Sequence, residues 1–113
     1  MSVETGQKHI NTDNNRKGDL AEHYAITWLW DEGYEVFRNA GCSGPIDLIA
    51  YNLETQETLL IDVKTFQEQV VGGGNYSSTP AQRSQLQKDL NVVFLGFNPI
   101  TRKLRFVEHR ETK

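Results

Sequence analysis

An eight-residue stretch near the middle of the chain, residues 58–65, constrains the fold more than any other segment. Its sequence, Thr-Leu-Leu-Ile-Asp-Val-Lys-Thr, is rich in aliphatic and β-branched residues and predicts a short buried strand. Because side chains alternate between the faces of a strand, Asp62 and Lys64 share one face and the aliphatic residues around them share the other. An acid and a base in such a strand are costly to bury without a use. The alternative is an exposed face on which they form a weak surface ion pair.

A second acid stands in a similar apolar segment. Residues 45–51, Pro-Ile-Asp-Leu-Ile-Ala-Tyr, predict another strand with Asp47 near its start. The polar segment between the two strands, residues 52–57, is short enough to be a hairpin loop. Antiparallel pairing would bring Asp47 towards Asp62 and Lys64. We therefore expect two acids and a lysine to converge at one place.

A helix is predicted upstream, over residues 16–32, where apolar residues recur at the spacing of one helical face and Gly33 ends the pattern. Glu22 falls at the edge of the apolar stripe. A glutamate in that position is often simply solvated. If the helix packs on the sheet, however, Glu22 can reach the two aspartates.

Three further segments predict a strand and two loops. Residues 34–38 resemble a first strand, and residues 39–44 form a loop whose two glycines permit a tight turn or the close approach of a ligand backbone. Residues 70–78 contain three consecutive glycines and predict a flexible loop. The alternative for this glycine-rich segment is a loop that orders over a bound substrate.

The C-terminal part predicts a helix and two strands. Thr79 would cap the helix and Pro80 would occupy its first turn, with the helix running through residue 89. Residues 91–97 predict a buried strand and residues 104–108 an edge strand. The expected architecture is an α/β fold with a mixed sheet flanked by helices, in the order helix, three strands, helix, two strands.

Length and charge set outer limits. The chain has 113 residues, and we expect a flexible arm over residues 1–15 and one domain over residues 16–113. Twelve basic residues against fifteen acids, a net charge of −3, argue against coating nucleic acid through bulk charge but leave room for a local basic patch. With no long apolar run, no leader and a single cysteine, we expect a cytoplasmic protein without membrane contact.

The predicted cluster suits metal-assisted chemistry. Glu22, Asp47 and Asp62 offer the hard oxygen ligands that Mg²⁺ or Mn²⁺ prefers, whereas the three histidines and one cysteine lack zinc spacing. The glycine-containing loop lacks the ending of a phosphate-binding loop, so we expect no nucleotide cofactor. A metal beside a lysine favours phosphodiester hydrolysis, in which the metal lowers the pKa of the attacking water. Lys64 would orient that water or offset charge on the phosphoryl oxygens.

In this order and spacing, the motifs resemble those of the PD-(D/E)xK nuclease superfamily and, more narrowly, its small Holliday-junction-resolvase-like members. The resemblance covers about residues 17–108 and implies a restriction-endonuclease-like core. Two departures are Ile46, which separates Pro45 from the aspartate, and an aspartate where resolvases often have glutamate. The implied catalytic residues are Glu22, Asp47, Asp62 and Lys64, and the implied metal ligands are Glu22, Asp47, Asp62 and the backbone carbonyl of Val63.

The resemblance implies a Mg²⁺-dependent endonuclease acting on branched DNA, with Mn²⁺ able to substitute, and a homodimer. Alternatives are a nuclease of the same fold in DNA repair or restriction, a non-catalytic DNA-binding or regulatory protein, and a plain structural domain. Exposed aromatic residues could form a dimer surface; they are Trp28, Trp30, Phe94, Phe97 and Phe106. Candidate substrate contacts are Gln82, on the second helix, with Thr65, Arg38 and Arg83, and the basic stretch 102–105 could also contact phosphates.

Overall fold

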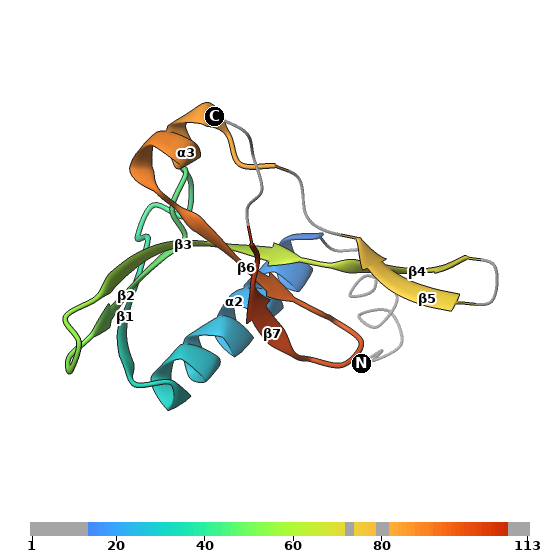
Figure 1. Ribbon diagram of the computed structural model, residues 1–113, viewed down its shortest axis with the longest axis horizontal. Helices are drawn as coiled ribbons and strands as arrows, with labels where there is room; N and C mark the ends of the chain where they lie inside the picture. Colours follow the sequence, from blue (N-terminus) through green and yellow to red (C-terminus); the bar gives the residue numbers. More distant parts are fainter. Residues whose placement is uncertain (1–13, 72–73, 79–81, 109–113) are drawn as a thin grey trace, which may run out of the picture.

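A computed structural model describes residues 14–71, 74–78 and 82–108 of the chain, with side chains described for residues 16–66 and 82–108. Within these residues, nine helices and strands follow one another (Figure 1). They are α2 (Asn14–Asp31), β1 (Tyr34–Arg38), β2 (Leu48–Asn52), β3 (Thr58–Thr65), β4 (Gln67–Val71), β5 (Gly74–Ser78), α3 (Gln85–Leu90), β6 (Val93–Phe97) and β7 (Leu104–Phe106).

Five of the strands form one mixed sheet in the order β1-β2-β3-β6-β7. The first three strands pair antiparallel, β6 runs parallel to β3, and β7 returns antiparallel to β6. A parallel neighbour requires a crossover, and α3 lies within the connection between β3 and β6. The expected α/β architecture and its order of elements are therefore confirmed for this sheet, with β3 at its centre.

The core lies between α2 and one face of the sheet (Figure 1). Ala25 and Leu29 of α2 are fully buried against Leu48, Ile61 and Leu95 of the central strands. Val63 packs against the same core, so the intervening Asp62 and the following Lys64 point to the opposite face. The predicted division of faces is confirmed, and the acid and base lie on the side of the sheet away from α2.

Both predicted helices have different beginnings in the structure. Helix α2 already includes residues 14 and 15, which the sequence pattern assigns to the N-terminal arm, and residues 1–13 of that arm lie outside the described residues. Helix α3 begins at Gln85, with Ser84 as its N-cap, so the prediction that Gln82 lies on this helix is wrong. The predicted cap, Thr79, and Pro80 lie outside the described residues. Ser84 sets the start because its side chain accepts a hydrogen bond from the backbone N–H of Gln87.

The segment predicted to be a flexible loop forms a hairpin instead. The backbones of β4 and β5 pair antiparallel from Gln67 opposite Ser78 to Val71 opposite Gly74, as a separate two-stranded sheet. Gly72 and Gly73 lie outside the described residues. The sequence pattern did not predict this strand pairing.

The expected aromatic surface is also corrected. Phe94 and Phe97 are 2% and 1% exposed, so neither contributes to an apolar patch, whereas Trp30 is 61% exposed. Phe97 is covered because its ring stacks on Tyr24 of α2, with 5.1 Å between the ring centroids. None of the helices in the described part of the chain has the length and apolar character to cross a membrane.

Candidate active site

The backbone holds Asp47 just before β2, between two neighbouring strands. Its N–H donates to the carbonyl of Ile61 on β3 at 2.8 Å, and its own carbonyl accepts from the N–H of Asn39 at 2.9 Å. These bonds continue the strand ladders beyond Leu48. The carboxylate then reaches across to β3, where its Oδ2 accepts a hydrogen bond of 2.8 Å from the backbone N–H of Val63. The predicted approach of Asp47 to β3 is thereby confirmed.

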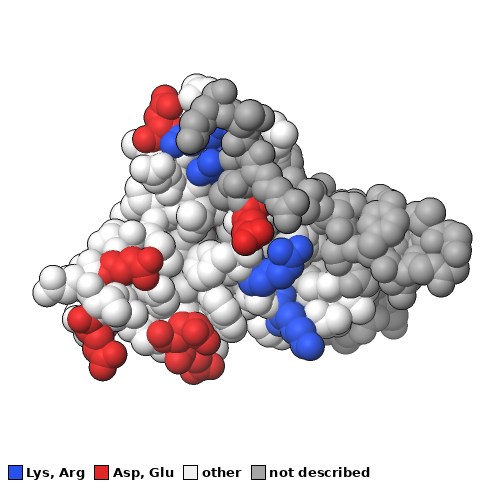
Figure 2. All heavy atoms as spheres, viewed as in Figure 1, with Lys and Arg blue, Asp and Glu red and all other residues white. Residues whose placement is uncertain are grey.

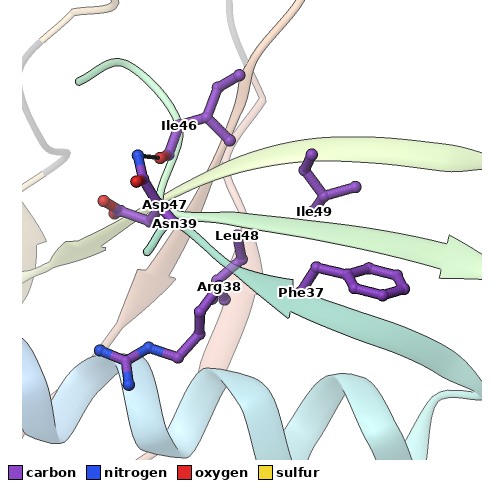
Figure 3. Close-up of a pocket in the computed structure, with 7 residues that line it drawn as sticks. All are labelled: Phe37, Arg38, Asn39, Ile46, Asp47, Leu48 and Ile49. Carbon is purple, nitrogen blue, oxygen red and sulfur yellow. Dashed lines mark hydrogen bonds between the residues drawn. The ribbon is translucent and has the colours of Figure 1, made fainter. Parts of the chain in front are cut away.

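The loop before Asp47 is held by one side chain. Asn39 Nδ2 donates to the carbonyl of Ser43 at 2.6 Å. It also donates to the carbonyl of Ile46 at 2.8 Å, as Figure 3 shows. Gly44 has a φ of 105°, a left-handed conformation that favours glycine. The tight turn expected from the glycines is therefore present, and it places Asp47 at the start of β2, beside β3.

Asp62 and Lys64 lie together on the face away from α2. Lys64 Nζ is 3.4 Å from Asp62 Oδ2, and the two side chains are 38% and 13% exposed, the lysine being the more exposed. The ammonium group also lies over the ring of Phe94, 5.3 Å from its centroid. Because Asp62 is mostly buried, this pair differs from the weak surface ion pair that was the alternative.

Gln87 is the residue of this site that the sequence pattern did not predict. It is buried, 7% exposed, and its Nε2 donates to Asp62 Oδ2 at 2.7 Å and to the carbonyl of Pro45 at 3.0 Å. Its Oε1 accepts from the N–H of Ser84 at 3.1 Å. The polar groups of this amide are thus all used, and they tie α3 to β3 and to the loop before Asp47. The signal was the Ser-x-x-Gln capping box, which marks where α3 begins.

Negative charge accumulates at Asp47. Burial, the hydrogen bond with the Asp62 side chain and the negative charges of Asp62 and Glu22 together raise the pKa of this carboxyl to about 7, against the opposing effect of the hydrogen bond from the Val63 N–H. Glu22 itself pairs with Arg38, whose Nε lies 3.2 Å from its Oε1 (Figure 3 shows Arg38 reaching towards α2). Glu22 is therefore close enough to influence Asp47 but is bound elsewhere.

The structure thus brings Asp47, Asp62 and Lys64 together and leaves Glu22 with Arg38. Within the described residues, no three His, Cys, Asp or Glu side chains are placed to hold a metal ion. The assignment of Glu22 as a third ligand remains a prediction. Two carboxylates do meet, and the carbonyl of Val63 points to the same side as its N–H, towards Asp47. This oxygen-only donor set fits a hard divalent cation, and such a cation would offset the accumulated negative charge.

The other predicted substrate contacts lie on separate segments of the chain. Thr65 is exposed at the end of β3, and Gln82 is exposed before α3. Arg83 Nη1 donates to the carbonyl of Val92 at 3.0 Å, which ties it to the chain before β6. A contact of any of these side chains with substrate remains a prediction.

Comparisons with known proteins identify the family of the chain and a similar fold. The model of a family described as "Uncharacterised protein family UPF0102" matches residues 21–108. The fold is similar to that in "The structure of a bacterial homing endonuclease: I-Ssp6803I", with a TM-score of 0.61 and 18% sequence identity. The match covers 84% of this chain and 64% of that chain, less than two thirds of its length. No curated protein gives a significant match. At this identity the likeness concerns the fold, and it confirms the restriction-endonuclease-like core.

Proposed function

The chain belongs to the UPF0102 family, a Holliday-junction-resolvase-like family of the PD-(D/E)xK superfamily, and from this premise we propose that it is a metal-dependent DNA endonuclease. The observation that carries the proposal is the meeting of Asp47, Asp62 and Lys64 where the start of β2 lies beside β3. An acid pair can hold a divalent cation, and an ammonium group beside it can offset the charge that develops on a phosphate during hydrolysis.

We assign the metal to Asp47, Asp62 and the carbonyl of Val63, with Glu22 as a further ligand once it leaves Arg38. Mg²⁺, or Mn²⁺ in its place, would supply Lewis-acid polarisation of the scissile phosphate and a lowered pKa for the attacking water. The ammonium group of Lys64 offsets charge that grows on the phosphoryl oxygens. Gln87 is a positioning residue, because its amide holds the Asp62 carboxylate without reaching the reacting atoms.

For substrate and assembly, we propose branched DNA cut by a homodimer. A four-way junction presents two equivalent strands, and two copies of one site related by a twofold axis would cut them symmetrically. Large exposed apolar side chains, among them Trp30 and Phe37, support self-association. Analytical ultracentrifugation of the chain with and without a junction tests this assembly, and a monomer in both conditions contradicts it.

The test of activity is cleavage of labelled linear, flap and four-way-junction DNA in Mg²⁺, Mn²⁺ or EDTA. We expect products with either metal, none in EDTA, and a loss of at least about 100-fold in rate for Lys64→Ala, because electrostatic groups of this kind contribute that much in other enzymes. Lys17→Ala is the matched control, since it removes an exposed lysine of α2 and should cleave at the wild-type rate.

Two results would refute the proposal. Products that persist in EDTA exclude metal-dependent cleavage, and a Lys64→Ala variant that cleaves at the full rate excludes the assigned site. Binding of DNA without cleavage under all metal conditions would indicate a DNA-binding protein of this fold instead.

A further inference from the structure

A row of residues crosses the sheet beside the candidate active site. Lys64 on β3 lies opposite Gly96 on β6, and Gly96 lies opposite Arg105 on β7. Residues paired across neighbouring strands point to the same face, so Arg105 shares the face of Asp62 and Lys64. Lys64 and Arg105 are two strand spacings apart, so their Cα atoms are separated by about 10 Å.

The absence of a side chain at Gly96 lets Phe66 occupy the middle of this row. A Cβ at position 96 would collide with the ring of Phe66, which is 3% exposed and lies directly over the glycine. The guanidinium of Arg105 stacks on the same ring, with its Cζ 4.6 Å from the ring centroid. Stacking of this kind orients an arginine while its hydrogen-bond donors stay available. Arg105 is exposed, so its charge faces solvent.

The surrounding surface is basic in an acidic protein. Residues 90–107 contain no acid, although the chain carries a net charge of −3, and they include Lys103 and Arg105, which are both exposed on the β6–β7 hairpin. Figure 2 shows lysine and arginine side chains gathered over this hairpin, with an acidic side chain at the upper end of the patch. A cavity of about 360 Å³ opens there; its lining residues are Phe66, Asn98, Thr101, Lys103, Leu104 and Arg105.

We propose that Arg105, with Lys103, binds the phosphate backbone of the DNA a few nucleotides from the bond that is cut. This inference rests on the proposed endonuclease function and names the surface that receives the substrate. A planar guanidinium binds phosphate through two parallel hydrogen bonds, and an exposed cation at this distance from Lys64 meets the same strand beyond the reacting phosphate. Such contacts are independent of base sequence, so the surface sets affinity and register.

Arg102 provides a matched control on the same hairpin. Its guanidinium lies 5.2 Å from the ring centroid of Tyr24, and its Nη1 donates to the Tyr24 hydroxyl at 3.3 Å. Tyr24 belongs to α2, so Arg102 lies on the opposite side of the sheet from Arg105. Both residues are exposed, and Arg102→Ala removes the same charge from the face of the sheet opposite Arg105.

The experiment measures fluorescence anisotropy of a labelled four-way junction and a linear duplex in EDTA, at several salt concentrations, so that cleavage does not interfere. We expect Arg105→Ala to weaken binding to both DNAs by about tenfold and to lower the salt slope by about one released counterion, whereas Arg102→Ala stays within about twofold of wild type. Arg105→Lys keeps the charge and should retain the wild-type salt slope. In Mg²⁺, Arg105→Ala should raise KM and leave kcat unchanged.

The outcomes separate this inference from the proposed function. If the wild type cleaves DNA but Arg105→Ala binds with unchanged affinity and salt slope, or Arg102→Ala loses as much, the inference is wrong and the endonuclease stands. If the wild type neither binds nor cleaves any DNA, both this inference and the proposed endonuclease function are wrong. Circular dichroism melting shows whether each variant is folded. If Arg105→Ala is unfolded, the folded Arg105→Lys variant provides the test. A salt slope equal to that of the wild type supports the inference, and a salt slope reduced by about one counterion overturns it.

Discussion

The raised pKa of Asp47 predicts how stability depends on pH when no metal is bound. Asp47→Asn replaces the carboxyl with an amide of the same shape, whose oxygen can still accept from the Val63 N–H and whose Nδ2 can donate to Asp62. The variant therefore imitates the protonated carboxyl at every pH. Any difference in the free energy of unfolding that develops between variant and wild type as pH rises therefore reports the cost of ionising Asp47 in the folded protein.

The magnitude follows from the two protonation equilibria. A rise in pKa from 3.8 to about 7 corresponds to about 4 kcal/mol, and solvent screening at this half-buried carboxyl reduces it to about 2 kcal/mol. Because the folded pKa is raised, the folded protein retains a proton between pH 4 and 7 that the unfolded chain has lost. The wild type consequently loses stability across this range, and above pH 7 the full cost is present.

The assay is urea denaturation of both proteins in EDTA at several pH values from 4.5 to 8. We expect the free energies of unfolding to agree closely at the acidic end and Asp47→Asn to be about 2 kcal/mol more stable at pH 8. Subtracting the two curves removes the titration of the groups that do not interact with Asp47, so the difference reports Asp47 together with its neighbour Asp62. A difference that stays constant with pH would refute the reasoning, as would a variant that is less stable at pH 8.

Three further predictions concern the supports of the site. Gln87→Leu removes the amide that binds Asp62 and should cost about 1–3 kcal/mol of stability in chemical denaturation and reduce cleavage; unchanged values would show that the amide is dispensable. Ser84→Ala removes the N-cap of α3 and should cost about 1 kcal/mol by the same assay, and no loss would mean that the helix does not depend on its cap. Gly96→Ala should cost about 1–3 kcal/mol, because the added methyl group meets the ring of Phe66, and Phe66→Leu in the same chain should recover part of it; a stable single variant would contradict this packing.

The alternation of side chains along residues 58–65 by itself determined much of the site. One period-two pattern places Asp62 and Lys64 on a common face, and the short polar segment before it requires an antiparallel hairpin that brings Asp47 alongside. These are local constraints, set by chain geometry over a few residues. The order of elements along the chain followed from the same kind of pattern, and it is confirmed for the helices and for the strands of the mixed sheet.

Tertiary structure alone decided which distant groups meet. Gln87 binds the carbonyl of Pro45, forty-two residues away in the sequence. Because Ser84 caps α3, the glutamine that lies on this helix and contacts the site is Gln87, whereas Gln82 precedes the helix. The pairing of β4 with β5, and the partnership of Glu22 with Arg38 in place of the two aspartates, likewise depend on contacts between separate segments. Periodicity reports the face on which a side chain lies, but the partner across a sheet or between a helix and a sheet is set by packing, which no single segment encodes.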